Sequence, residues 1–381
     1  MRSVPSQPLF AHTFTEAVDF LLREAKRQGV SDIHFAPRSH GDCAGGQARF
    51  RISGVLQTFR EFKNLGEWDD LLKEIKRRAG LSFQTGFAQD RRFSDSQTQS
   101  DYRVSLVPVQ VGDREAEQIV LRVLPRDALF SLDKLGLAFD ALAALHDALN
   151  ANQGLIVVTG PTGSGKTVTL MSALYAIDRE KYNVMTLEDP VEYALLGITQ
   201  VQVSDNLSFA QGLRSFLRQD PDYILVGETR DPETASALIQ AANTGHVVLT
   251  TLHTNSAADA FTRLKALGVN EDLARENATF VCAQRLVPRL CPQCKVFDFD
   301  ASAKLKKLFP EEFTDEIFNA AQKDFPLSAP GCVACAGTGV SGRELLFEFI
   351  APQRNAAGLK SAAISLLKKG VLNAQEVFAL V

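Results

Sequence analysis

The octapeptide at residues 160–167, Gly-Pro-Thr-Gly-Ser-Gly-Lys-Thr, constrains the fold of this 381-residue chain more than any other feature. It fills every position of the pattern G-x-x-x-x-G-K-[ST], in which a glycine-rich loop joins a buried strand to a helix. An apolar run at 155–158 precedes the loop, and residues 168–171 continue as the start of a helix. The sequence therefore predicts a strand–loop–helix unit that binds a nucleoside triphosphate.

Each part of this loop suits a polyphosphate ligand. The glycines let successive backbone N–H groups converge on phosphate oxygens, and the helix N-terminus adds a partial positive charge. We expect Lys166 to reach the β- and γ-phosphates and the hydroxyl of Thr167 to hold Mg²⁺. The predicted binding residues are Gly160, Pro161, Thr162, Gly163, Ser164, Gly165, Lys166 and Thr167.

Strand and helix patterns alternate regularly from about residue 136. Such alternation predicts a parallel sheet with helices on both faces, and ligands then gather at the carboxyl ends of its strands. The predicted strands are 155–159, 183–188, 223–227 and 246–252, and the predicted helices are 166–177, 208–218, 231–243 and 257–267.

The first part of the chain has a different order of helix and strand patterns, which indicates a small mixed α/β domain ending near residue 125. Helical patterns follow residue 14 and cover 68–79, and strand patterns occur at 32–35, 48–52, 102–107 and 118–124. A chain of this length is expected to form two or three domains.

The overall composition excludes some classes of protein. The chain is 45% hydrophobic and 23% charged, which is typical of a soluble globular protein. A net charge of −4 gives no reason to expect a nucleic-acid partner. No apolar run approaches the about 20 residues that span a bilayer, and the N-terminus lacks a secretory signal. We therefore expect a cytoplasmic protein that contacts membranes only through partners or surface patches.

Two predicted strands end in acidic residues beside the phosphate loop. Glu188 follows one strand and Glu228 follows another, after Gly227, which stands where a metal-binding Asp is common. Phosphoryl transfer to water needs an anchored metal and a group that orients the attacking water. We assign Glu188 to the water and Glu228 to Mg²⁺, and the reverse assignment is the alternative. A third possibility is that one acid only caps a helix, although Asp231 is the more natural cap.

The strand at 247–252 is bracketed by His246 and His253. His253 follows Thr250 and Thr251 at the end that faces the predicted site. This position favours a sensor of the γ-phosphate, whereas a lone histidine on a strand is usually a core or surface residue.

Four cysteines form two C-x-x-C pairs, Cys291 with Cys294 and Cys332 with Cys335, with 37 residues between the pairs. Two such turns can complete a tetrahedral S₄ site for Zn²⁺. A redox pair is the alternative interpretation for a single C-x-x-C. The duplicated pattern predicts a structural zinc site with an insertion between its two halves.

Taken together, these motifs resemble the ATPases of bacterial type II secretion and type IV pilus assembly, the GspE/PulE/PilB type. The resemblance covers nearly the whole chain. It rests on GPTGSGKT (160–167), TLEDPVEY (186–193), LRQDPDYILVGETRD (217–231), TGHVVLTTLHTNSA (244–257), AQRLVPRLCPQC (283–294), GCVACAGTGVSGR (331–343), SDIHFAP (31–37) and RFRISGVL (49–56).

The resemblance implies a domain order. An N-terminal PAS-like domain (1–130) would precede a RecA-like ATPase core (131–285), a tetracysteine zinc-binding subdomain (286–342) and a helical C-terminal subdomain (343–381). Many family members carry a further N-terminal domain that binds a membrane anchor. Because this chain begins close to the PAS-like domain, the resemblance leaves its anchoring partner open.

The resemblance also implies a homo-hexamer that hydrolyses ATP at the inner face of the bacterial inner membrane and drives a membrane-embedded platform protein. Arginines of the first domain would then reach the triphosphate of a neighbouring subunit. The family pattern places them at Arg92 and Arg103, with Arg122 as a weaker third. An arginine supplied in this way can raise the rate by about 10³–10⁵.

Two other functions remain as alternatives. A retraction-type or conjugation-type motor of the same superfamily would share the nucleotide motifs, although retraction-type relatives generally lack the four cysteines. A zinc-containing, nucleotide-dependent DNA-binding protein would instead need a basic stripe near the cysteines, and the sequence has none.

Overall fold

The computed structural model describes residues 13–40, 43–52, 54–125, 131–193, 195–313, 328–335, 337–352, 354–355 and 358–379. The chain divides into two compact units, Met1–Ala128 and Leu129–Val381. One hydrophobic core lies in the first unit and two lie in the second, where they are built on opposite faces of one sheet.

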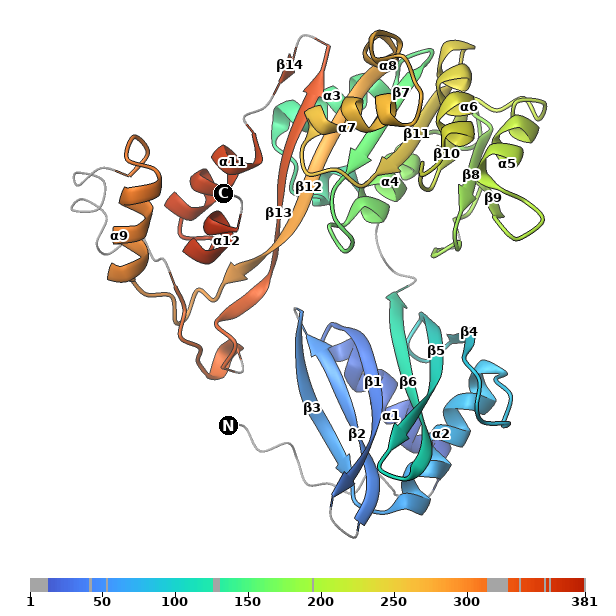
Figure 1. Ribbon diagram of the computed structural model, residues 1–381, viewed down its shortest axis with the longest axis vertical. Helices are drawn as coiled ribbons and strands as arrows, with labels where there is room; N and C mark the ends of the chain where they lie inside the picture. The colour runs from blue at the N-terminus through green and yellow to red at the C-terminus, as the bar shows by residue number, and fades with distance from the viewer. Residues whose placement is uncertain are drawn as a thin grey trace. The chain divides into compact units, whose positions relative to one another are not determined.

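The N-terminal unit is an antiparallel sheet of six strands in the order β3-β2-β1-β6-β5-β4. Two helices, α1 and α2, pack together against one face of this sheet (Figure 1). Helix α1 begins at Thr13, whose side chain accepts a hydrogen bond from the N–H of Glu16, an N-cap interaction. The elements are α1 (Phe14–Arg27), β1 (Val30–His40), β2 (Cys43–Ile52), β3 (Val55–Phe62), α2 (Leu65–Ala79), β4 (Gln89–Asp95), β5 (Ser100–Val111) and β6 (Arg114–Pro125).

The second unit contains a sheet of eight strands in the order β14-β13-β12-β7-β11-β10-β8-β9. The six strands from β12 to β9 run parallel, and β13 and β14 are antiparallel to their neighbours. The strands are β7 (Gly154–Thr159), β8 (Val184–Glu188), β9 (Thr199–Gln202), β10 (Tyr223–Val226), β11 (Val247–Leu252), β12 (Ala278–Leu290), β13 (Val340–Ala351) and β14 (Arg354–Asn355).

Helices cover both faces of the second sheet. Leu155 and Val157 of β7 pack with residues of α5 to α8 on one face, and Ile156 and Val158 pack with residues of α3 and α4 on the other. The predicted α/β fold, with a largely parallel sheet between two layers of helices, is therefore confirmed. The helices and short 3₁₀ turns are η1 (Leu132–Lys134), α3 (Phe139–Leu149), α4 (Lys166–Tyr175), α5 (Phe209–Phe216), α6 (Pro232–Asn243), α7 (Ala257–Ala266), α8 (Glu271–Asn277), α9 (Phe299–Leu308), η2 (Val333–Cys335), α11 (Leu359–Lys368) and α12 (Ala374–Phe378).

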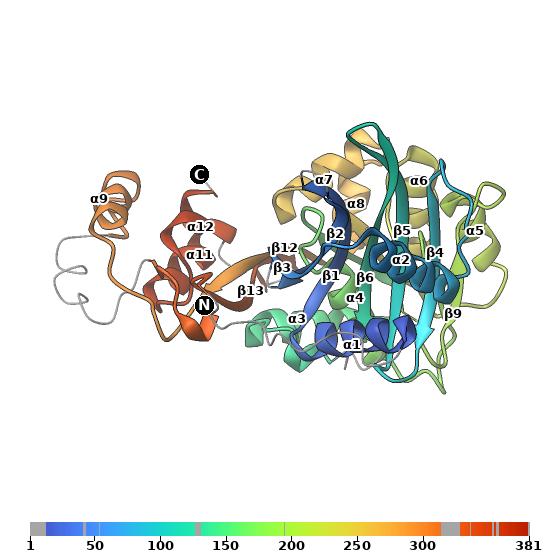
Figure 2. The ribbon, with the colours of Figure 1, turned by 90° about the horizontal axis from the view of Figure 1, so that it is seen from below.

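The part of the chain after residue 277 departs from the expected division. Strand β12 runs without a break across the expected boundary at 285/286, and the segment expected to be helical from residue 343 begins with β13. The two strands pair from Val281↔Ile350 to Leu290↔Val340, and this ladder supplies the hydrogen bonds that a helix would have made internally. Together they form a ribbon that extends from the sheet toward α11 and α12 (Figures 1 and 2).

Within the described residues, no helix is both long enough and apolar enough to cross a lipid bilayer.

Candidate active site

The glycine-rich loop lies where the sequence predicts it, between the end of β7 and the start of α4. Gly165 adopts a left-handed conformation, with φ of 89°, directly before the first residue of the helix. Gly160 has φ of 146°, and a Cβ atom there would lie only 2.3 Å from the carbonyl oxygen of Gln284. Both positions therefore require glycine, because a side chain would be strained or would collide with β12.

The Lys166 side chain folds back over the loop. Its ammonium donates hydrogen bonds to the carbonyl oxygens of Gly160 (2.8 Å) and Pro161 (3.1 Å). Burial lowers the pKa of Lys166, and the negative charge of Glu228 acts in the opposite direction. Thr167 follows, partly buried, in the first turn of α4. The loop thus carries its cation and its hydroxyl at the N-terminus of one helix, as phosphate binding requires.

The predicted acids and His253 lie at the same edge of the sheet as the loop. Strands β7, β11, β10 and β8 are consecutive parallel neighbours, so their carboxyl ends share one edge. The loop follows β7, His253 follows β11, Glu228 lies beyond β10, and Glu188 is the last residue of β8. The sheet order therefore arranges a phosphate-binding loop, an imidazole and two carboxylates in sequence along this edge.

Glu228 is held by charged neighbours. Its Oε2 accepts a hydrogen bond from Arg230 at 2.5 Å, and its Oε1 lies 3.2 Å from Nε2 of His253. Burial raises the pKa of the Glu228 carboxyl, but Arg230, His253 and Lys166 together hold it below its ordinary value. Glu228 is therefore ionised over a wide pH range, as a carboxylate that supports a divalent cation must be.

Glu188 lies in a different environment. Only 4% of the residue is exposed, and its Oε1 accepts hydrogen bonds from the hydroxyl of Thr186 (2.6 Å) and the amide of Gln200 (2.8 Å). Burial raises the pKa of the Glu188 carboxyl, although both hydrogen bonds oppose that change. A buried carboxylate with a raised pKa is suited to take a proton from water.

The threonines near His253 have structural partners. The hydroxyl of Thr250 lies 2.8 Å from that of Thr229, and the hydroxyl of Thr251 donates to the carbonyl oxygen of Gly227 at 2.6 Å. These bonds join β11 to the segment that carries Glu228. His246 precedes β11 at its amino end, and its Nδ1 lies 3.0 Å from the carbonyl oxygen of Ala241, so it lies apart from the other predicted residues.

Asp231 caps helix α6, as the sequence predicts. Its carboxylate accepts hydrogen bonds from the N–H and the hydroxyl of Thr234, both at 2.8 Å.

The three predicted arginines of the N-terminal unit form a row across one face of its sheet. Arg92, Arg103 and Arg122 pair directly across β4, β5 and β6, and Arg122 pairs with Asp32 of β1. Directly paired residues of an antiparallel sheet point to the same face. Arg122 is bound to Asp32, with Nε 3.1 Å from Oδ1, and Arg51 of β2 lies 3.8 Å from the other carboxylate oxygen. The sheet register thus gathers basic side chains that are up to 71 residues apart in the sequence on the face opposite the helices.

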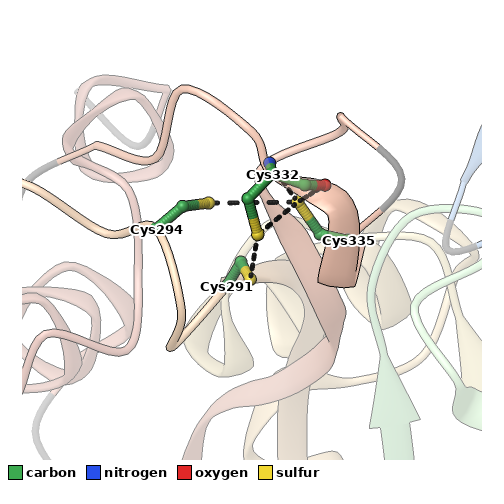
Figure 3. Close-up of side chains that lie close together, drawn as sticks. All are labelled: Cys291, Cys294, Cys332 and Cys335. Carbon is green, nitrogen blue, oxygen red and sulfur yellow. Dashed lines mark hydrogen bonds between the residues drawn. The ribbon is translucent and has the colours of Figure 1, made fainter. Parts of the chain in front are cut away.

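The four predicted cysteines come together (Figure 3). All four sulfur atoms lie within 4.8 Å of one another, and three of the S–S distances are 3.9 Å. A tetrahedron with Zn–S bonds of about 2.3 Å has edges of about 3.8 Å, so the cluster fits this ion. The backbone N–H groups of Cys332 and Gly339 donate to the sulfur of Cys335 and lower its pKa to about 6, which favours the thiolate that metals bind.

Sequence reasoning missed the partners that hold the acids. Arg230 lies two residues after Glu228, and its charge there is a signal that could have been used. Gln200 reaches Glu188 only because β9 pairs with β8. No local pattern in the sequence predicts the contact between Gln200 and Glu188.

The fold and the glycine-rich loop between β7 and α4 place the chain in the P-loop class of α/β proteins. A family model described as "Type II/IV secretion system protein" matches residues 11–373, and the chain belongs to this family. The resemblance noted in the sequence is therefore confirmed.

Several curated relatives are similar over most of the chain. The type IV pilus assembly ATPase PilB of Acinetobacter baylyi is 40% identical over 339 residues, which are 87% of this chain and 56% of that protein. A putative type II secretion system protein E of Escherichia coli K12 is 39% identical over 349 residues, 89% of this chain and 67% of that protein. The chain spans little more than half the length of two Acinetobacter baylyi relatives, 56% of PilB and 58% of TfpB.

Solved structures share the fold. The ATPase DotB of Legionella pneumophila superposes with a TM-score of 0.72 at 21% identity, and 99% of each chain is covered. The pilus retraction motor PilT with bound ADP gives a TM-score of 0.61 at 23% identity, with 97% of each chain covered. At this level of identity the likeness concerns the fold alone.

Proposed function

We propose that this protein is a motor ATPase that hydrolyses ATP to power type IV pilus assembly or type II protein secretion. The observation that carries the proposal is the shared edge of the second sheet, where the phosphate loop, Glu228 and Glu188 follow parallel strands. The membership of the type II/IV secretion family and the names of the relatives supply the physiological setting.

Each residue of the edge has a distinct task in this proposal. The loop N–H groups and Lys166 bind the triphosphate, and the Thr167 hydroxyl and Glu228 hold Mg²⁺, which neutralises charge on the β- and γ-phosphates. Glu188 orients and deprotonates the attacking water. The opposite pKa changes of the two carboxyls support this division over the reverse one. His253, next to Glu228, monitors the γ-phosphate.

The active site is completed between subunits of a homo-hexamer in this proposal. Arg92 and Arg103 contact the triphosphate bound by a neighbour and stabilise the charge that develops during transfer. Their alignment in adjacent strands supports a joint role. Arg122, the weaker third candidate, is bound to Asp32 through its guanidinium.

The four cysteines hold a structural Zn²⁺ that fixes the end of the β12–β13 ribbon. Two observations support this assignment: the short distances between the four sulfur atoms, and the backbone N–H groups that donate hydrogen bonds to the sulfur of Cys335. The cluster also favours an assembly or secretion motor over a retraction motor, on the basis of the sequence resemblance. The motor acts at the inner face of the inner membrane on a platform protein of the secretion or pilus system.

A substitution in the loop tests the proposal. Lys166→Ala removes the cation that binds the β- and γ-phosphates, and we expect ATP hydrolysis to fall below detection in a phosphate-release assay. Lys134→Ala is the matched control, since Lys134 is exposed in η1 and does not lie at the edge of the sheet that carries the phosphate loop. Turnover by Lys166→Ala at the wild-type rate would refute the proposed site.

A further inference from the structure

Gln284 of β12 is buried against the phosphate loop, 120 residues away from it in sequence. Only 1% of the residue is exposed. Its amide nitrogen donates to the carbonyl oxygen of Ser164 at 2.8 Å, and its amide oxygen accepts from the hydroxyl of Thr169 at 2.9 Å. A single side chain therefore contacts both the loop and the first turn of the helix that follows it.

The backbone of β12 contributes to the same contact. Strand β12 runs parallel to β7 with Ala283 opposite Thr159, so Gln284 lies level with the first residue of the loop. Its carbonyl oxygen occupies the space that a Cβ atom of Gly160 would need, and its side-chain nitrogen would lie 3.2 Å from a Cβ atom of Gly165. The first and last glycines of the loop thus pack against the same residue.

The hydrogen bond to Ser164 controls the direction of a backbone donor. The carbonyl of Ser164 and the N–H of Gly165 belong to one planar trans peptide unit, in which they point in opposite directions. When Gln284 holds the carbonyl on its side of the loop, the N–H of Gly165 is turned to the other side. In a phosphate loop, that side is where backbone N–H groups converge on the ligand.

We propose that Gln284 is a positioning residue for ATP, which fixes the Ser164–Gly165 peptide so that its N–H faces the phosphates. Thr169 holds the other end of the same amide, so the loop and the start of α4 keep one relative orientation. The inference rests on the proposed function, since it assigns a determinant of ATP affinity to that site. In this role Gln284 contacts neither ATP nor the attacking water. It acts indirectly, by orienting the backbone of the phosphate loop.

The substitution Gln284→Glu tests this role, because it removes the donor to Ser164 and retains an acceptor for Thr169 with little change of volume. A buried carbonyl that loses its donor is costly, and we expect the KM for ATP and the Kd for ADP to rise about tenfold. We expect kcat to change much less, because ground-state and transition-state binding weaken together. Gln240→Glu is the matched control, since Gln240 is exposed on α6.

Variants of Thr169 provide an independent measurement if Gln284→Glu does not fold. Thr169→Val removes the hydroxyl with little change of shape and should raise the KM for ATP several-fold. Thr169→Ser keeps the hydroxyl and should have a KM close to that of the wild type. A general loss of stability would lower the active fraction and the Tm in both variants and would leave KM unchanged.

The outcomes separate this inference from the proposed function. Wild-type protein that neither binds nor hydrolyses ATP would count against the proposed function. Normal wild-type turnover, together with wild-type KM in Gln284→Glu and Thr169→Val, would overturn the role of Gln284 alone.

Discussion

Replacing Glu188 by glutamine removes the charge of one buried carboxyl and leaves its shape unchanged. The new amide oxygen can still accept from Thr186 and Gln200, so the side chain should keep its place at the end of β8. The loss is then confined to the ability to take a proton. General-base catalysis contributes about 10²–10⁴ in rate, and we expect kcat to fall by that factor, about 3–5 kcal/mol of activation free energy.

Nucleotide affinity provides the second half of this test. Because Lys166 and the loop amides are untouched, the Kd for an ADP or ATP analogue should change by less than about threefold, a difference below 1 kcal/mol. Turnover is measured by phosphate release, and affinity by fluorescence of a labelled nucleotide. Glu180→Gln is the matched control, because Glu180 is exposed and precedes the amino end of the same strand.

The pH dependence of the wild type gives a further check on the same residue. The active form of Glu188 is ionised, and burial raises its pKa. Activity should therefore be full above that pKa and should fall as the pH drops through it, at a pH above the ordinary glutamate value of about 4.3. A Glu188→Gln variant with wild-type kcat, or one whose nucleotide affinity collapses with a changed Mg²⁺ requirement, would refute the assignment and favour Glu228 as the base.

Two other substitutions test more distant parts of the proposal. Cys291→Ser should release zinc and lower the Tm, since structural Zn²⁺ contributes about 10–16 kcal/mol to folding in small peptides; unchanged metal content by elemental analysis would contradict the site. An excess of Arg92→Ala subunits mixed with wild type should reduce turnover beyond simple dilution if active sites are shared between subunits, because a lost trans arginine costs about 10³–10⁵ in rate. Arg91→Ala is the control, because Arg91 is also exposed on the same strand but belongs to the opposite face of the sheet.

Local patterns were sufficient to predict the part of the fold that carries the phosphate loop. Strands β7, β8, β10 and β11 are fully buried and consist mainly of apolar and threonine residues, with Glu188 as the last residue of β8. Because parallel strands end at one edge, the acids at the carboxyl ends of β8 and β10 could also be placed beside the loop. These predictions needed only the sequence neighbours of each residue.

Contacts set by strand pairing could not be predicted in the same way. In the first unit, strands β3 and β4 escaped prediction, as did β9, β12, β13 and β14 in the second. Strand β4 shows why: its residues are mostly polar and none is fully buried, so it gives no apolar alternation. The positions of Gln200 and Gln284 depend on which strands become neighbours, and neither residue differs in local sequence from an exposed glutamine. The arginine row depends likewise on the register of four strands.

The ribbon of β12 and β13 explains why division of the chain by motif placed a boundary in the wrong position. On β12, Gln284 contacts the phosphate loop, and Cys291 follows the last residue of the same strand. On β13, Glu348 lies opposite Ala283, and its two oxygens accept from the first N–H groups of α7 (Ala257, 2.6 Å) and α11 (Leu359, 2.8 Å). The cysteine cluster, the C-terminal helices and the nucleotide site thus share one pair of strands. Because both strands of this ladder carry residues that contact the phosphate loop or the C-terminal helices, no boundary drawn between motifs along the sequence could separate these parts.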